Sequence, residues 1–202
     1  MSIHHKATGF VFKKEDRLEA DRVFSVFTRE FGRLEIFGKG IRKIASKLKG
    51  GMEIFRIAEI EFVQGKTKKT LTDAAAMEKF KTIAQSPEKM EIAAGICGLV
   101  EDFIKGEQKD EVVFGLLQET FAILEAEEAR QLIYFYFFWN FVSLLGYAPD
   151  LSRISPDTAG LIRVIKNRNW PHLAALETRA STQKSLKEIS GNYHYYLLGH
   201  TR

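Results

Sequence analysis

The residues of this chain with the clearest chemical potential are the basic side chains between Lys39 and Gly51. This stretch carries five cations and no acid, and glycines stand near both of its ends. The cations are Lys39, Arg42, Lys43, Lys47 and Lys49. A loop of this charge and glycine content can follow and hold an irregular polyanion, and a nucleic-acid backbone is the obvious candidate. A basic run also occurs as an ordinary solvated loop, so that alternative stays open.

More basic residues surround this loop in the sequence. Arg29 and Arg33 flank the turn signal at Gly32, and two further turns are basic. Those turns contain Lys13, Lys14 and Arg17, and Lys66, Lys68 and Lys69. Aromatic side chains could stack on bases, although a Phe in a strand more often fills the core. The stacking candidates are Phe24, Phe27 and Phe37. We predict phosphate contacts by Arg29, Arg33 and the five loop cations, without base-specific recognition.

Other kinds of chemistry lack the residues they need. The stretch from Gly32 to Lys39 resembles a phosphate loop, but it holds one residue too many, and Gly40 stands where Ser or Thr should bind magnesium. One Cys and five scattered His do not form a zinc-binding pattern. No serine lies in a nucleophile-elbow motif. We therefore predict that the protein is not an enzyme and has no cofactor or metal.

The charge of the chain is distributed unevenly along the sequence. Residues 1–80 carry 17 Lys/Arg and 11 Asp/Glu, a net charge of +6, whereas residues 81–202 carry 13 and 15, a net charge of −2. The basic part is the part expected to meet a polyanion.

The single cysteine, Cys97, lies at helical spacing among apolar residues, which predicts a buried thiol. A chain with one cysteine also fits a reducing cytosol. Leu132–Tyr147 is shorter than the roughly 20 apolar residues of a membrane span, so we predict a buried helix and a cytoplasmic protein.

The first 75 residues read as five short strands with turns between them. The segments are Phe10–Phe12, Val23–Thr28, Leu34–Ile36, Met52–Phe62 and Lys69–Thr72. The fourth alternates apolar and acidic residues, with an interruption at residues 55–57 that predicts a bulge or a strand covered on both faces. Five strands in so few residues are typical of a small closed barrel of the oligonucleotide-binding (OB) type.

From about residue 76 the pattern predicts helices. Ser86-Pro87 and Ser155-Pro156 are helix starts, and further helices are expected at 111–125, 128–145, from Trp170 and at 182–198. The segment at 128–145 is apolar nearly all round, so we expect other helices to bury it. The predicted fold is α+β, with an OB-fold nucleic-acid-binding domain at residues 1–78 and an all-helical domain at residues 79–202.

Several motifs, in this order, resemble the bacterial DNA repair protein RecO family. They are Gly9–Phe12, Glu19–Val23, Phe27–Leu34, Lys39–Lys43, Leu144–Leu151 and Tyr195–Gly199. The resemblance implies an OB fold joined to a helical domain. It also implies a nucleoid-associated protein that binds single- and double-stranded DNA and anneals complementary strands. Its partners are expected to be RecR, the tail of the single-strand-binding protein, and, less directly, RecF and RecA, which is loaded onto coated DNA.

The sequence departs from the family pattern in two respects. Many family members build a zinc ribbon from cysteines that follow the Leu144–Leu151 motif, but Ile154 stands at the first of these places and the other cysteines are absent. The chain is also shorter than usual, so a zinc role is not expected.

An acidic tail with an apolar end, such as that of the single-strand-binding protein, needs a groove with a cation at its rim. The candidate rim cations are Arg130, Arg163, Lys166 and Arg168. The alternatives to a DNA-binding mediator are an RNA-binding OB protein and a protein-interaction adaptor.

Overall fold

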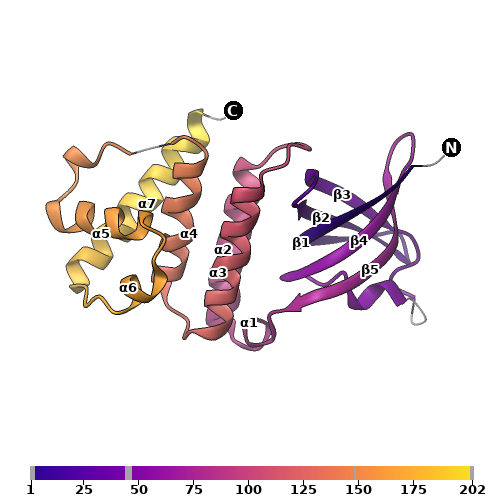
Figure 1. Ribbon diagram of the computed structural model, residues 1–202, viewed down its shortest axis with the longest axis horizontal. Helices are drawn as coiled ribbons and strands as arrows, with labels where there is room; N and C mark the ends of the chain where they lie inside the picture. The colour runs from indigo at the N-terminus through magenta and orange to yellow at the C-terminus, as the bar shows by residue number, and fades with distance from the viewer. Residues whose placement is uncertain (1–2, 44–46, 148, 201–202) are drawn as a thin grey trace. The chain divides into compact units, whose positions relative to one another are not determined.

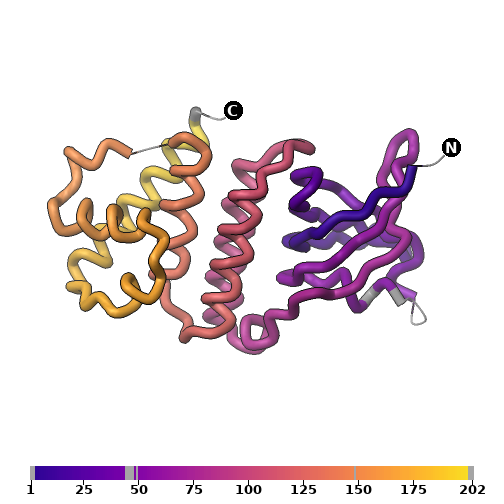
Figure 2. The backbone as a smooth tube through the Cα atoms, in the orientation of Figure 1, coloured from indigo at the N-terminus to yellow at the C-terminus, as the bar shows by residue number. Residues whose placement is uncertain are grey.

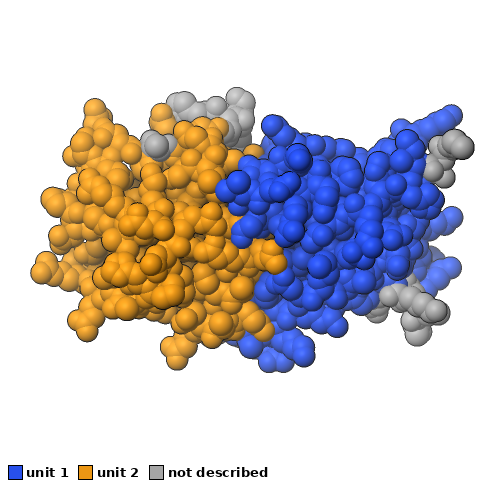
Figure 3. All heavy atoms as spheres, viewed as in Figure 1, with its two compact units in different colours: residues 1–86, 104–115 blue, residues 87–103, 116–202 orange. Residues whose placement is uncertain are grey.

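The computed structural model describes residues 3–43, 47–147 and 149–200 (Figure 1). It divides into two compact units, coloured separately in Figure 3: residues 1–86 with 104–115, and residues 87–103 with 116–202. The backbone path passes from strands, in indigo to magenta, to helices that end in yellow (Figure 2). The predicted domain boundary between residues 78 and 79 stays a prediction.

Five strands close into a barrel in the first unit. They are β1 (Ile3–Arg17), β2 (Asp21–Thr28), β3 (Gly32–Gly38), β4 (Arg56–Gln64) and β5 (Lys69–Lys79). The strands pair in the order β1-β2-β3-β5-β4, and β4 pairs with β1 to close the ring. The β3–β5 pair is parallel, whereas the other four pairs are antiparallel. A five-stranded OB-type barrel followed by helices confirms the predicted fold class.

The period of two along each strand separates the core from the outer face of the barrel. On β3, Leu34 and Ile36 are buried, whereas Glu35 between them is exposed. Apolar side chains from the other strands join these two in one cluster, which includes Val11, Phe24, Val26, Ala58, Ile60 and Leu71. The outer positions of β3, which are Arg33, Glu35 and Phe37, are therefore the ones that can meet a ligand.

The fourth strand is shorter than its alternating sequence predicts. It begins at Arg56 because Phe55 has a φ of 58°, a left-handed conformation that interrupts an extended chain. The predicted bulge is present as a register shift between Ile57 and Ala58. Ile54 and Phe55 form a turn just before the strand, and η1 (Lys47–Gly50) is a short 3-10 helix.

The fifth strand is longer than predicted, so the helical start expected at residue 76 is wrong. Ala74, Ala75 and Ala76 pair with β4, and this pairing extends β5 to Lys79. A short helix, α1 (Lys81–Gln85), follows and buries Ile83. The segment 104–115 also belongs to the barrel unit, although it comes later in the sequence.

The remaining helices lie where local signals predict them, to within a few residues. They are α2 (Pro87–Phe103), α3 (Glu111–Ala126), α4 (Gln131–Leu144), α5 (Pro156–Lys166), α6 (Trp170–Ala174) and α7 (Ala180–His200), with a 3-10 turn, η2 (Leu151–Arg153). Ser155 is the N-cap of α5, and its hydroxyl accepts a hydrogen bond from the Thr158 amide at 3.4 Å.

Helix α4 is the buried centre of the helical unit. Nine of its residues are buried, including Tyr136, Phe138 and Trp139, as its all-round apolar sequence predicts. Asn140 is satisfied there, because its Nδ2 donates to the carbonyls of Tyr136 (2.8 Å) and Ile165 (3.0 Å). Cys97 on α2 is buried as predicted, and burial raises the pKa of its thiol. Within the described residues, no helix has the length and apolar character needed to cross a membrane.

Candidate nucleic-acid interface

The β1–β2 turn and the start of the β3–β4 connection lie together at one end of the barrel. The Arg42 amide donates to the Ala20 carbonyl at 3.0 Å, and the Gly40 amide donates to the Asp21 carboxylate at 2.7 Å. The Arg42 guanidinium donates to the Leu18 carbonyl at 3.3 Å. These bonds bring Arg42 beside the β1–β2 hairpin, whose basic residues include Lys13, Lys14, Arg17 and Arg22.

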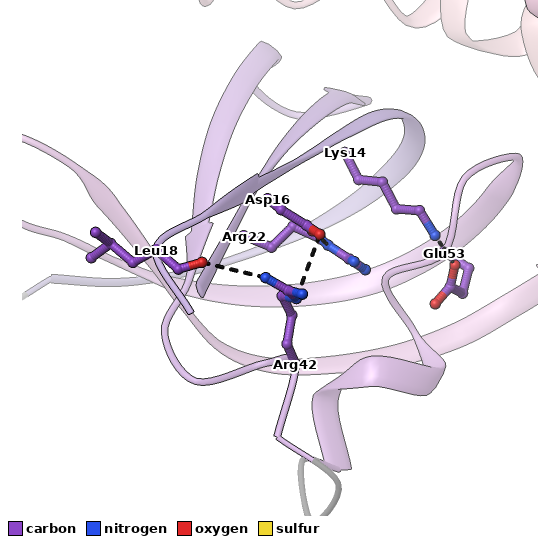
Figure 4. A network of polar contacts seen from close by, with 6 residues as sticks. All are labelled: Lys14, Asp16, Leu18, Arg22, Arg42 and Glu53. Atoms are coloured by element: carbon purple, nitrogen blue, oxygen red, sulfur yellow. Dashed lines mark hydrogen bonds and ion pairs between the residues drawn. The ribbon is translucent and has the colours of Figure 1, made fainter. Parts of the chain in front are cut away.

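One acid, Asp16, organises the arginines at this end of the barrel (Figure 4). Its carboxylate accepts from Arg22 Nε at 2.7 Å and lies 3.5 Å from Arg42 Nε. The hydrogen bond from Arg22, with the charges of Arg42 and Lys14, lowers the pKa of Asp16. Arg42 is therefore a positioned cation whose charge is partly offset before any ligand binds. Lys14 pairs with Glu53.

The other loop cations differ in how far the structure defines them. Lys39 and Lys43 are exposed, and among the described residues no acid lies within ion-pair distance of either ammonium group. Lys47 and Lys49 have their backbones in η1, but their side chains lie outside the described part of the structure. The assignment of Lys47 and Lys49 as DNA contacts stays a prediction. The same holds for Lys39, Arg42 and Lys43.

Arg29 and Arg33 do not lie with the loop cations. Lys39 comes six positions after Arg33, with the last five residues of β3 between them, which is about 20 Å along an extended strand. The Arg29 guanidinium lies over the Phe114 ring at 5.0 Å, and that of Arg33 lies over the Phe12 ring at 5.4 Å. Arg33 also donates to the Ile104 carbonyl at 3.3 Å. The five predicted residues whose side chains the structure describes thus fall at two ends of the barrel, joined by the outer face of β3.

A groove of about 710 Å³ lies over this outer face, within the range of ligand-binding pockets. Its floor is formed by Arg33, Glu35 and Phe37 of β3 with Val23 of β2. Its walls come from the β4–β5 turn and from the segment that follows α2, and they include Gln64, Thr67, Lys68, Lys69, Lys105, Gly106 and Glu107. Of the described lining residues, four are cations and two are acids.

The aromatic candidates separate clearly in the structure. Phe24 is fully buried in the barrel core, and Phe27, although on the same face as Arg33, is covered by Phe114 at a ring separation of 6.1 Å. The favoured core position is therefore confirmed for these two residues, and neither ring is available to stack on a base. Phe37 is half-buried in the groove floor, and Lys68 Nζ lies 3.6 Å from its ring centroid.

The groove joins segments that are distant in the sequence, so it was not predicted. The basic turn at Lys66–Lys69 was visible, but Lys105 and Glu107 gave no signal because they approach β3 only in the folded chain. Among the described residues, no group of three or more His, Cys, Asp or Glu side chains could hold a metal ion.

A second groove, of about 580 Å³, lies in the helical unit between the first turns of α4 and α7. Its apolar side is formed by Leu132, Phe135 and Leu186, and its cations are Arg130, Lys184 and Lys187. Of the four candidate rim cations, Arg130 lines this groove and donates to the Ala174 carbonyl at 3.1 Å.

The other rim candidates lie elsewhere in the helical unit. Arg168 is held by Glu119, which also accepts a hydrogen bond from Tyr136. Arg163 and Lys166 are exposed in the last turn of α5 and do not line the groove.

The chain matches two family models, described as recombination protein O N terminal over residues 1–80 and recombination protein O C terminal over residues 84–154. It is 30% identical over 146 residues to the DNA repair protein RecO of Dehalococcoides mccartyi, covering 72% of this chain and 58% of that protein. The RecO of Rubrobacter xylanophilus is 29% identical over 148 residues, covering 73% of this chain and 59% of its own length. The RecO of Heliobacterium modesticaldum is 26% identical over 167 residues, covering 83% and 60%. The chain thus spans under two thirds of these relatives, and it belongs to the RecO family of DNA repair proteins.

Proposed function

We propose that this protein is a non-enzymatic, DNA-binding mediator of recombinational repair. It binds single- and double-stranded DNA, promotes annealing of complementary strands and acts with RecR to load RecA onto DNA coated by single-strand-binding protein. The observation that carries the proposal is a family match over an OB-type barrel whose exposed end gathers Lys39, Arg42 and Lys43. The RecR contact rests on family membership alone.

The cations at the end of the barrel would act through the phosphate backbone. Each Lys or Arg that neutralises a phosphate releases condensed counterions, and this release favours binding whatever the base sequence. Two strands held on neutralising charges repel one another less, which is the physical condition for annealing. Arg42 is suited to this because Asp16 and the Leu18 carbonyl hold its guanidinium in place.

A direct test is competition between DNA and RNA of matched sequence. A labelled oligodeoxythymidine bound to the protein is challenged with unlabelled DNA or RNA strands of equal length, and the two inhibition constants are compared. The proposal predicts tight DNA binding that weakens steeply with salt. Preference for the RNA strand would overturn it in favour of an RNA-binding OB protein, and the absence of binding to either strand would favour a protein-interaction adaptor.

The groove between α4 and α7 supports a partner site within the same function. The acidic tail of single-strand-binding protein, with its apolar end, requires cations beside an apolar surface, and Lys184 and Lys187 lie beside Phe135 in this groove. The N-cap residue of α4, Arg130, makes no side-chain capping bond, so backbone amides of the first turn can also favour an anion.

The tail contact is tested with a fluorescent peptide that has several acidic residues and an apolar carboxyl end. Lys184→Gln and Lys187→Gln are suitable changes because both side chains are exposed and neither supports the fold. Arg163→Gln on α5 is the matched control, since it removes one exposed positive charge outside the groove. We expect weaker peptide binding by the two lysine variants alone, and equal binding by all three would exclude this groove.

A further inference from the structure

The segment after α2 places an acid against the nucleic-acid groove of the barrel. The Gly106 carbonyl accepts from the Arg33 amide at 3.2 Å, and the Ile104 carbonyl accepts from the Arg33 guanidinium. On the neighbouring residue, Gly32, a Cβ atom would lie 2.2 Å from the Gln108 carbonyl oxygen, so the two backbones touch. These contacts fix the position of Glu107, the residue between Gly106 and Gln108.

Glu107 uses that position to pair with Lys69 at the start of β5. The Lys69 side chain is only 15% exposed, whereas that of Glu107 is 57% exposed. The ammonium group therefore sits in the wall of the groove, while its anion approaches from the solvent side. A carboxylate in such a place presents two oxygens to a cation, as a phosphodiester does.

The groove floor beside this ion pair suits an unpaired base. Phe37 offers one half-buried ring face, and Lys68 lies over it at 3.6 Å. A base that stacks on Phe37 would take the place of the Lys68 ammonium and leave it to meet a phosphate. Glu35 on the floor disfavours a phosphate at the centre of the groove and so directs it to the lysine wall.

We infer that this groove binds one unpaired nucleotide, with its base on Phe37 and its phosphate at Lys69, and that Glu107 holds the place of that phosphate in the unbound protein. The inference rests on the proposed DNA-binding function and adds a site selective for single strands. Bases inside a duplex are stacked and paired, so a duplex cannot present this arrangement. Entry of a single strand exchanges one anion for another at Lys69.

The exchange makes Glu107 a competitor of single-stranded DNA. In the Glu107→Gln variant the phosphate no longer displaces a carboxylate, and we expect affinity for oligodeoxythymidine at low salt to rise by up to about fivefold, the range of an exposed ion pair. Affinity for a blunt duplex of equal length should change no more than it does in the control. Glu111→Gln is that control, because Glu111 is an exposed acid of the same segment that does not line the groove.

The experiment measures single-strand and duplex binding by fluorescence anisotropy for the wild type, Glu107→Gln, Glu111→Gln, Lys69→Gln and the Glu107→Gln/Lys69→Gln pair. The gain from Glu107→Gln should be confined to the single strand and should vanish when Lys69 is absent. Equal single-strand affinity in Glu107→Gln and Glu111→Gln would overturn the inference while leaving the DNA-binding function standing. Failure of the wild type to bind single strands would overturn the proposed function itself, and the inference with it.

Discussion

Charge removal at the end of the barrel gives the most quantitative prediction. For single strands, each phosphate contact contributes about 0.7 to the magnitude of the slope of log affinity against log salt. Lys39 and Lys43 are exposed and pair with no acid among the described residues, so Lys39→Gln and Lys43→Gln should each lower that magnitude by about 0.7. Arg42→Gln should lower it less, because Asp16 already lies 3.5 Å from the guanidinium.

The assay is anisotropy of a labelled oligodeoxythymidine between 50 and 200 mM salt. Over that fourfold range, a slope change of 0.7 corresponds to roughly a 2.6-fold change in Kd relative to the wild type. Lys6→Gln is the matched control, because Lys6 lies in the first half of β1 and pairs with Glu59 at 2.7 Å. Slopes for the Lys39 and Lys43 variants equal to those of the wild type and the control would refute the assignment of these cations.

Three further changes test separate parts of the structure. Phe37→Leu keeps the packing of a half-buried side chain but removes a ring face, so single-strand affinity should fall roughly 5- to 140-fold with little change for duplex, and equal loss on both DNAs would argue against stacking. Gly32→Ala places a Cβ at a φ of 71° and against the Gln108 carbonyl, so urea unfolding should show a loss of at least about 1–2 kcal/mol, and an unchanged midpoint would contradict the backbone contact. Burial, with the charge of Asp102, raises the pKa of Tyr134 to about 12. The unfolded chain releases the phenol proton at a lower pH than the folded protein does. The contribution of the buried neutral phenol to the free energy of unfolding is therefore fully present below pH 10, and roughly 2–3 kcal/mol of it is lost as the pH rises through 12. Tyr134→Phe should accordingly lose less stability in alkaline titration than the wild type.

Local sequence signals were sufficient for the architecture. The short segment Leu34–Ile36 after the turn signal at Gly32 predicted β3, and the Ser155-Pro156 pair predicted the start of α5. These signals act within a few residues, so one sequence carries them. The end of β5 did not follow from them, because its last residues are strand only through pairing with β4. The left-handed Phe55 was also invisible, since a bulky residue rarely adopts that conformation.

The sequence predicted which types of residue form the candidate interface, but it did not predict how they are arranged in the folded chain. The period of two on β3 could have marked Phe37 as outward, because it alternates with the buried Ile36. Nothing in the sequence indicated that Phe114 covers Phe27. The pairing of Lys69 with Glu107 joins residues 38 positions apart, and such long-range contacts leave no periodic signal.

The central claim, that this protein is a mediator acting on coated single strands, is tested most directly by an annealing assay. Complementary strands are covered with the cognate single-strand-binding protein, either intact or without its acidic tail, and duplex formation is followed by fluorescence quenching. The account predicts that the protein accelerates annealing of strands coated by the intact coat protein, and that tail removal or the Lys39→Gln/Lys43→Gln pair reduces this effect. Annealing no faster than in the absence of the protein, at any protein concentration, would contradict it.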